Sequence, residues 1–486
     1  MRKTKIIVTI GPSSSDEETL SRLISDGMDC ARLNFSHGTH EQHAQVIERI
    51  RRLSKEHNRT VGILQDLGGI KLRLGHLEEA RPVNLGDEVV ITADTESREP
   101  GVLPFPQPGV LRNLQVGNFV FIADGSVRLE VTEATPSRVY CRALSSGVVS
   151  SYKGVNLPGV PIDQPVFTDK DKADLLFGVE QQVDWVAVSF VRTAEDIHYA
   201  RRHLNAAGSK AMVMAKLERG EGIENIDSIL PEVDSVMVAR GDLGVEIPME
   251  RVPRVQRHIV DKANAAGKGV VIATQMLLSM VISPTPTRAE VSDVSNAVLE
   301  GADAILLSDE TAMGQYPVEA LRVAVSTINE AESEDAYPYY KNMETRDRTQ
   351  AITSAAAGLV RTLDSKPIVL TSTGRAALEL ARFRPANDIL AFSHDPTVLR
   401  KLCLGWGIQP TGVIPVQPDV AELVWQVLQS ALDLGAVTDQ DVVTIVHGFL
   451  TGVSGTTNAV QVLSMQEYLE NVGLPRASEQ MVGLRQ

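Results

Sequence analysis

The sequence has few cysteines and no long apolar run. Three cysteines, Cys30, Cys141 and Cys403, lie far apart in 486 residues. This number and spacing argue against a disulfide framework and a cysteine-based zinc site, and they fit a reducing cytoplasm. No stretch approaches the roughly 18 apolar residues that a membrane helix needs, and the apolar run after the N-terminal MRKTK is too short for a signal peptide. We therefore expect a cytoplasmic protein without a membrane partner.

A basic surface and the common nucleotide-binding loops are also lacking. The formal net charge is −15, which argues against nucleic acid as a partner because binding to its phosphates needs clustered positive charge. Small anionic ligands are still allowed, since a local group of Arg and Lys decides their binding. The sequence has no Walker A loop and no kinase Gly-rich loop. A nucleotide would have to be held by another arrangement.

What is present is an ordinary globular composition in a long chain. Hydrophobic residues make up 43% and charged residues 22%, so the chain can bury a sizeable core. A chain of 486 residues is too long for one core, and we expect two to four domains.

Strand and helix patterns alternate in two stretches of the N-terminal two thirds of the chain. Eight apolar runs typical of buried strands are KIIVTIG, CARLNFS, VGILQDL, WVAVSF, AMVMAKL, SVMVA, GVVIATQM and AILLS. Helical patterns separate them, the first with a predicted capping box formed by Ser15 and Glu18. Eight βα units predict an α/β fold, a TIM (β/α)8 barrel.

The βα pattern is interrupted after the third strand and ends before the C-terminus. From Gly68 to about Pro165 we find no convincing helix but several short β-type runs, and FVFIADGSVRLEV predicts a hairpin that turns at Asp124 and Gly125. Beyond a polar linker around residues 332–348, a further βα series begins. The predicted domains are residues 1–67 (barrel, first part), 68–165 (inserted all-β lid), 166–345 (barrel, second part) and 346–486 (C-terminal α/β domain).

Charged side chains follow the fifth and sixth predicted strands. Lys216 and Glu218 point the same way because strand side chains alternate, and Asp242 lies between Gly241 and Gly244. Glu218 and Asp242 could hold one divalent cation, with Lys216 as a neighbouring positive charge. Taken alone, these residues also fit a structural Lys–Glu pair beside a Gly-Asp turn.

Further polar residues follow other strands of the same predicted barrel. They are Arg32, Asn34, Ser36 and His37 after the second strand, Asp66, Lys71 and Arg73 after the third, and Thr274 after the seventh. Strand ends meet at one face of a barrel, so these groups converge. Arginines match phosphate oxygens, and the amides of Gly241 and Asp242 form an anion site if they begin a helical turn. A metal and Lys216 would stabilise charge on a moving phosphoryl group, so the set favours phosphoryl transfer on a small acid.

Longer motifs carry a resemblance to a known family. They are ARLNFSHG, KGVNLPG, SFVR, AKLE, MVARGDLGVE, ATQMLLSM and PTRAEVSDVSNAVLEG, in this order and spacing. Over nearly its whole length the chain resembles the pyruvate kinases. The resemblance implies the same three-part fold in a homotetramer. It also implies that phosphoenolpyruvate and ADP give pyruvate and ATP, with Mg²⁺ or Mn²⁺ as cofactor and a lid that excludes water.

The resemblance implies a role for each matching residue. Arg32 would contact the phosphoryl group, Lys216 would stabilise it during transfer, and Thr274 would help to protonate the enolate. The metal would be held by Glu218 and Asp242, and the amides of Gly241 and Asp242 would bind the substrate carboxylate. The residues that would face the nucleotide are Asn34, Ser36, His37, Arg73 and Lys153.

One position departs from most of the family. Potassium-dependent members carry a glutamate where this chain has Lys71 and a threonine where it has Leu67. The Lys71 ammonium could supply the charge that K⁺ otherwise brings, which predicts activity without K⁺. The alternative is that Lys71 points to solvent and K⁺ still binds at Asn34, Ser36 and Asp66.

Two loops of the C-terminal domain resemble the family's effector-phosphate pocket. One is formed by Thr371, Ser372, Thr373, Gly374 and Arg375, and the other is Gly452 to Thr457 (GVSGTT). They predict regulation by a phosphorylated sugar or a nucleotide. An ordinary helix cap and a hairpin are the alternative.

Two other functions use the same residues. A metal-dependent barrel aldolase or lyase also stabilises a pyruvate enolate, although the β-rich insert and Lys153 favour a nucleotide partner. A non-catalytic metabolite-binding regulator could keep the fold. The presence of Lys216, Glu218, Asp242 and Thr274 together argues against it, because binding alone does not need all four.

Overall fold

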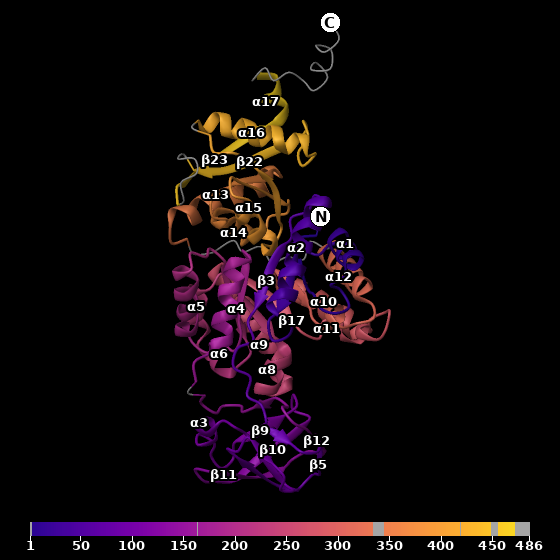
Figure 1. Ribbon diagram of the computed structural model, residues 1–486. Helices are drawn as coiled ribbons and strands as arrows, with labels where there is room; N and C mark the ends of the chain where they lie inside the picture. The colour runs from indigo at the N-terminus through magenta and orange to yellow at the C-terminus, as the bar shows by residue number, and fades with distance from the viewer. Residues whose placement is uncertain (1, 163, 334–344, 418, 449–454, 472–486) are drawn as a thin grey trace.

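The protein consists of three bodies arranged along one long axis (Figure 1). The computed structural model describes residues 2–162, 164–333, 345–417, 419–448 and 455–471. The lid lies at one end, the barrel in the middle and the C-terminal domain at the other end. Among the described helices, none combines the length and apolar character needed to cross a membrane.

The middle body is a closed barrel of eight parallel strands, as predicted. Their order around the barrel is β1-β18-β17-β16-β15-β14-β3-β2. The strands are β1 (Lys5–Thr9), β2 (Cys30–Asn34), β3 (Gly62–Asp66), β14 (Trp185–Val188), β15 (Met212–Leu217), β16 (Ser235–Ala239), β17 (Gly269–Ala273) and β18 (Ala304–Leu307). Nearly every strand residue is buried, because the interior covers one face and the surrounding helices cover the other.

Helices connect the strands on the outside of the barrel. They are α1 (Glu17–Asp26), α2 (His40–Glu56), α4 (Asp169–Glu180), α5 (Ala194–Ala206), α6 (Gly220–Glu224), α7 (Ile226–Ile229), α8 (Arg240–Glu246), α9 (Val252–Ala266), α10 (Arg288–Glu300), α11 (Asp309–Ala312) and α12 (Pro317–Ser333). The predicted capping box of α1 is wrong. Asp16, not Ser15, is the N-cap, and its carboxylate accepts from the amide of Thr19. Aspartate caps helices as well as serine does, and it lies one residue nearer the first turn.

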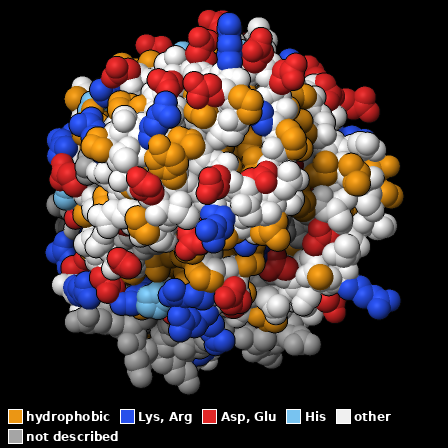
Figure 2. All heavy atoms as spheres, turned by 90° about the horizontal axis from the view of Figure 1, so that it is seen from below, with side chains coloured by type: hydrophobic (Ala, Val, Ile, Leu, Met, Phe, Trp, Pro, Cys, Tyr) orange, Lys and Arg blue, Asp and Glu red, His pale blue; other side chains and the backbone are white. Residues whose placement is uncertain are grey.

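The lid is built almost entirely of short strands. Its main sheet has the order β13-β9-β10-β11-β6-β8. The strands are β4 (His76–Leu77), β5 (Arg81–Val83), β6 (Glu88–Thr92), β7 (Glu96–Ser97), β8 (Val102–Pro104), β9 (Phe119–Ile122), β10 (Val127–Ala134), β11 (Arg138–Ala143), β12 (Gly147–Val149) and β13 (Val155–Asn156), with one short helix, α3 (Pro108–Leu111). The predicted hairpin is confirmed, because β9 and β10 pair antiparallel around Asp124 and Gly125, whose φ angles are 54° and 81°. Seen from this end, acidic and basic side chains are mixed with hydrophobic ones (Figure 2).

The C-terminal domain is a five-stranded sheet with helices. The strand order is β21-β20-β19-β22-β23, with only β23 antiparallel. The strands are β19 (Lys366–Leu370), β20 (Ile389–Ser393), β21 (Ile408–Val413), β22 (Val442–Gly448) and β23 (Thr457–Ser464). The helices are α13 (Arg348–Leu363), α14 (Arg375–Ala381), α15 (Pro396–Lys401), α16 (Val420–Asp433) and α17 (Met465–Asn471).

The C-terminal domain packs against the end of the barrel opposite to the lid. Lys5 at the start of β1 donates to the carbonyl of Ile408 at 2.7 Å, and the indole of Trp185 at the start of β14 donates to the carbonyl of Lys401 at 3.0 Å. Leu404 belongs to the same apolar cluster as the side chains inside the barrel. The carboxyl ends of the strands therefore face the lid, where the predicted site residues lie (Figure 1).

Candidate active site

Lys216 is the centre of a buried group of charges at the lid end of the barrel. Its ammonium lies on β15, 2.9 Å from Glu218 Oε1 and 3.2 Å from Asp66 Oδ1. It also donates to Ser189 Oγ at 2.8 Å. Burial lowers the pKa of Lys216, but the charges of Asp66 and Glu218 outweigh this effect and raise it above its ordinary value. The ammonium therefore stays charged although it is buried.

Arg32 approaches the same group from β2. Its Nε donates to Asp66 Oδ2 at 2.6 Å, and one terminal nitrogen donates to Thr9 Oγ1 at 3.0 Å. Burial raises the pKa of Asp66, but the positive charges of Lys216 and Arg32 lower it by more. The pKa of Asp66 therefore lies below its usual value. One carboxylate thus fixes both cations predicted to contact a phosphoryl group.

Glu218 and Asp242 are the two carboxylates predicted to hold a metal. Glu218 is 1% exposed and accepts from the amide of Phe190 at 2.8 Å. Its pKa is raised by burial, with Lys216 opposing and the charge of Asp242 adding to the increase. Magnesium is usually bound by one or two carboxylates, with substrate oxygens and water as further ligands. This pair offers carboxylates of that kind, and within the described ranges no three His, Cys, Asp or Glu residues form a ready-made metal cluster.

The start of α8 lies against Thr274 at the end of β17. The amide of Gly241 donates to Thr274 Oγ1 at 2.8 Å, so two predicted substrate-binding residues are in contact. Thr274 has a φ of 69°, a conformation that a β-branched residue adopts only when its surroundings impose it. Arg240 helps to hold Thr274 in this conformation, because its guanidinium donates to the carbonyl of Thr274 at 2.8 Å. The guanidinium is itself held by an ion pair with Asp293 at 2.7 Å.

A cavity of about 290 Å³ separates the barrel mouth from the lid. Lys71, Arg73 and Lys153 line it from the lid side, and Asp242 lines it from the barrel. The structure thus brings the predicted nucleotide residues Arg73 and Lys153 to the predicted metal ligand. Lys71 is exposed in this cavity.

Asn34 ends β2 and Ser36 and His37 follow it, and none of the three lines this cavity. The Asn34 side chain accepts from the amide of Ser36 at 3.0 Å. Ser36 is close to the beginning of the lid, because a Cβ on Gly68 would lie 3.2 Å from its hydroxyl. His37 is exposed. These three residues lie beside the first chain segment that leads into the lid.

Several residues of the site were not singled out from the sequence. Ser189 contacts Lys216, Phe190 contacts Glu218, and Arg240 holds Thr274. Arg219 and Glu246 line the lid cavity. Each lies inside or directly after a motif that resembles the family, but no local pattern distinguishes such residues from ordinary caps and ion pairs.

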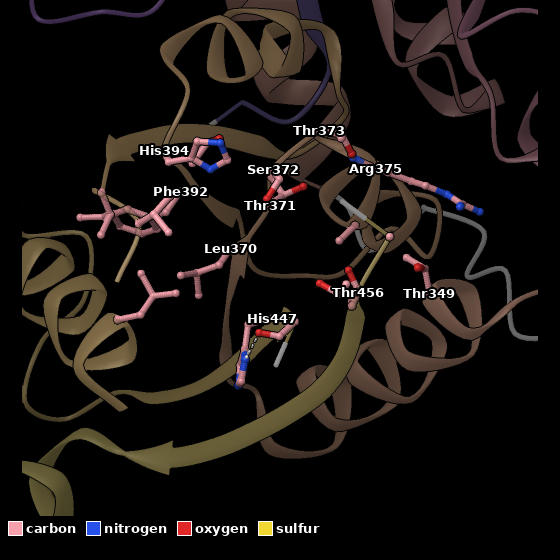
Figure 3. A pocket seen from close by; sticks show the side chains of 18 of the residues that line it. Thr349, Leu370, Thr371, Ser372, Thr373, Arg375, Phe392, His394, His447 and Thr456 are labelled. Carbon is pink, nitrogen blue, oxygen red and sulfur yellow. Dashed lines mark hydrogen bonds between the residues drawn. The ribbon is translucent and has the colours of Figure 1, made fainter. Parts of the chain in front are cut away.

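A second pocket of about 120 Å³ lies in the C-terminal domain (Figure 3). Thr371, Ser372, Thr373 and Arg375 line it, as predicted for the first loop. Gly374 instead supplies the N-cap of α14 with a φ of 90°. Residues Gly455, Thr456 and Thr457 of the second predicted loop also line it, whereas residues 452–454 lie outside the described part of the chain.

The pocket has a polar side and an apolar side. Thr349, Arg375 and Thr456 lie on one side, and Leu370 and Phe392 lie on the other (Figure 3). Arg375 is half exposed and forms an ion pair with Asp347. The Nε2 atom of His447, which is buried at the pocket, has no hydrogen-bond partner among the residues that the structure describes.

Comparison with known proteins identifies the family. The family description "Pyruvate kinase, barrel domain" matches residues 1–321, and "Pyruvate kinase, alpha/beta domain" matches residues 350–463. Pyruvate kinase 2 of Synechocystis sp. is 42% identical over 467 residues, covering 95% of this chain and 79% of that protein. Pyruvate kinase of Clostridium acetobutylicum is 37% identical over 477 residues, covering 95% and 99%. The crystal structure of a pyruvate kinase from Cryptosporidium parvum matches with a TM-score of 0.89 and 34% identity over 96% of each chain. The chain belongs to the pyruvate kinase family.

Proposed function

We propose that the barrel mouth transfers the phosphoryl group of phosphoenolpyruvate to ADP, through the residues described above. The observation that supports this assignment is the buried Lys216 ammonium, which Asp66 and Glu218 keep charged at the mouth that faces the lid cavity. A fixed positive charge in a water-poor site stabilises charge that develops on a transferring phosphoryl group.

The substrate residues act together in this assignment. Arg32, fixed by Asp66, binds phosphoryl oxygens, and the amides of Gly241 and Asp242 bind the carboxylate of phosphoenolpyruvate. For that, the amide of Gly241 leaves Thr274 Oγ1. The Thr274 hydroxyl, which donates to the carbonyl of Ala273 at 2.6 Å, turns from it to take part in protonation of the enolate.

Glu218 and Asp242 hold the divalent cation, Mg²⁺ or Mn²⁺. A bound cation supplies neutralisation and orientation of the reacting oxygens. Glu218 is ready for this role because Phe190 and Lys216 fix its two oxygens.

The nucleotide binds between barrel and lid in this proposal. Arg73 and Lys153 contact its phosphates from the cavity wall. Asn34, Ser36 and His37 contact it from the end of β2. The ammonium of Lys71, in the same cavity, replaces a bound K⁺, and the enzyme works without K⁺.

The remaining assignments rest on the resemblance. The domains are residues 1–67 and 166–345 (barrel), 68–165 (lid) and 346–486 (C-terminal domain), and the enzyme is a cytoplasmic homotetramer. The pocket at Thr371 to Arg375 binds a phosphorylated sugar or a nucleotide that regulates activity. The hydroxyl groups and Arg375 fit a phosphate, and the apolar side fits a sugar or base.

Pyruvate and ATP formation from phosphoenolpyruvate and ADP tests the assignment. The assay contains Mg²⁺ and either K⁺ or a bulky organic cation, with a chelator control. Equal rates with both cations and none with chelator are expected. Activity only with K⁺ would overturn the role of Lys71. Absence of activity in every buffer would favour an aldolase or a regulator.

Effector titration at subsaturating phosphoenolpyruvate tests the C-terminal pocket. A sugar monophosphate, a sugar bisphosphate and a nucleoside monophosphate are compared. We expect at least one to raise the rate. Flat responses to all three would remove the effector assignment.

A further inference from the structure

We propose that Ser189 is a positioning residue that couples the first lid connection, Leu67 to Lys71, to the Lys216 ammonium. The proposal rests on the phosphoryl transfer assigned above. It concerns how the lid and the catalytic lysine are held in one arrangement.

The Ser189 hydroxyl joins two groups that are far apart in sequence. Its oxygen accepts from Lys216 Nζ at 2.8 Å, and its proton is donated to the carbonyl of Leu67 at 2.7 Å. A hydroxyl has one proton to donate, and the Leu67 carbonyl is a much nearer acceptor for it than Asp66 Oδ1, which lies 3.5 Å away. Ser189 is 2% exposed, so water does not readily replace either partner.

The next residue makes a parallel connection. Phe190 has a φ of 57°, and its amide donates to Glu218 Oε2 at 2.8 Å. Gly69 packs against this turn with a φ of 64°, and a Cβ there would lie 3.0 Å from both the Phe190 ring and Ser189 Cβ. The first lid connection therefore touches the turn that fixes Lys216 and Glu218.

The described residues of the return connection are held by other contacts. Arg219 donates to the carbonyl of Val160 at 3.3 Å, and Arg192 donates to the carbonyl of Ile162. Gly159 in this connection also has a positive φ, 70°, but a Cβ on it would meet nothing within 4 Å. Gly69 in the first connection is thus packed against Ser189, a partner of Lys216, whereas Gly159 in the return connection is not.

This arrangement links lid position to phosphoryl transfer. Leu67 itself is buried in the barrel core, so a shift of the lid reaches Ser189 through Gly69. The packing of Gly69 against Ser189 and Phe190 then changes, and with it the direction of the Ser189 hydroxyl. Asp66 and Glu218 continue to hold the Lys216 ammonium, but its third partner, Ser189, is correctly oriented only while the lid covers the site. The competing reaction is attack by water, in which the bond from phosphorus to the enol oxygen breaks and a bond to the water oxygen forms. One water proton ends on the enolate carbon, giving pyruvate and inorganic phosphate.

The test compares Ser189→Ala, Gly69→Ala and the matched control Gly159→Ala. Pyruvate and ATP are measured separately with phosphoenolpyruvate, ADP and Mg²⁺. The natural enzyme should give one ATP per pyruvate. Ser189→Ala and Gly69→Ala should both give more pyruvate than ATP. Ser189→Ala should also lower kcat by about tenfold, as expected for a lost bond to a charged group.

The control separates coupling from simple strain. Gly159→Ala imposes the same unfavourable φ on the lid without touching Ser189, so its ratio should stay at one. Melting temperatures show any general loss of stability, which by itself would not change the ratio. A pyruvate-to-ATP ratio of one in Gly69→Ala, or an equal change of the ratio in Gly159→Ala, would overturn the proposal.

If Ser189→Ala does not fold, Gly69→Ala decides alone, because it keeps the hydroxyl. Loss of all activity in the natural enzyme would instead contradict the proposed function.

Discussion

The barrel mouth and the C-terminal pocket treat charge in opposite ways. At the mouth, the side chains of Asp66 and Glu218 are both 1% exposed and that of Lys216 is 11% exposed. In the pocket, the side chain of Arg375 is 52% exposed and that of its partner Asp347 is 39% exposed. The rest of the polar lining there is made largely of hydroxyl groups.

This difference shows what each site requires. Buried charges are costly unless they are paired, but they are strong and fixed in direction, which suits a site that stabilises a transition state. A half-exposed arginine is screened by water, so its ion pair is weak and can be exchanged for a ligand phosphate. The proposed chemistry and the proposed regulation therefore occupy different dielectric surroundings in the same chain.

The largest expected effect is that of Lys216→Met. It removes the charge that faces the phosphoryl group, and we expect kcat to fall about a thousandfold. It also leaves Glu218 without its buried cation, at a cost of about 3–5 kcal/mol in stability. Steady-state ATP formation and chemical denaturation measure the two effects. Lys172→Met is the control, because Lys172 pairs with Asp169 at the surface and should change neither. Similar losses in both variants would erase the distinction between buried and exposed charge.

Lys71→Glu tests the cavity between barrel and lid, where Lys71 is exposed. Reversal of this charge should lower activity in the absence of K⁺ by about tenfold or more, and K⁺ should restore it, because a monovalent cation then neutralises the glutamate. The measurement is the initial rate at a series of K⁺ concentrations. A variant whose rate does not change with the K⁺ concentration would show that Lys71 has no part in cation replacement.

Arg375→Ala sharpens the description of the C-terminal pocket. Loss of its guanidinium should raise the effector concentration for half-maximal activation by about tenfold, the equivalent of one charged hydrogen bond. Effector titrations at fixed phosphoenolpyruvate measure this shift. Arg254→Ala removes an exposed arginine from the barrel and should leave the titration unchanged. An unchanged curve for Arg375→Ala would place the phosphate elsewhere.

The smallest expected effect concerns Asp347, the N-cap of α13. Burial raises the pKa of this carboxyl, but the amide of Gln350 and the guanidinium of Arg375 together lower it by more. The pKa of Asp347 is therefore below its usual value. The stabilisation is therefore present above the unfolded-state pKa and is lost as pH falls through the folded-state pKa.

Asp347→Ala should destabilise the C-terminal domain by about 1 kcal/mol near neutral pH, and Asp347→Asn should cost less because asparagine also caps helices. Melting curves at several pH values measure this difference. The gap between Asp347→Ala and the natural chain should close in acid. A gap that persists there would show that the ionised carboxylate is not the source of the stability.

Local patterns predicted most of the barrel and less of the C-terminal domain. The eight barrel strands are apolar runs and were all found from the sequence. Strand β21 was missed, since its sequence IQPTGV is mostly half-buried and contains no apolar run. Strand β23 was also missed. It lies at the edge of the sheet, and its residues do not alternate between buried and exposed.

Some residues of the candidate site could also be predicted from local patterns, and others could not. Lys216, Glu218 and Asp242 could be named because each follows a recognisable strand. Ser189 could not be given a role, although its SFVR motif was noticed, because its partners Leu67 and Lys216 lie 122 and 27 positions away. Nor did the sequence show that Thr274 takes a left-handed conformation, which depends on its contact with Arg240.

The sequence by itself determined the order of the βα units, the place of the insert and the residues that follow each strand, because these depend on periodicity and composition over short distances. Tertiary structure decided which of those residues meet. Closure of the barrel placed Asp66 between Arg32 and Lys216, and the lid brought Arg73 and Lys153 to Asp242. It also decided which charges are buried and therefore strong. Burial depends on what the rest of the chain packs against each position, and no local pattern contains that information.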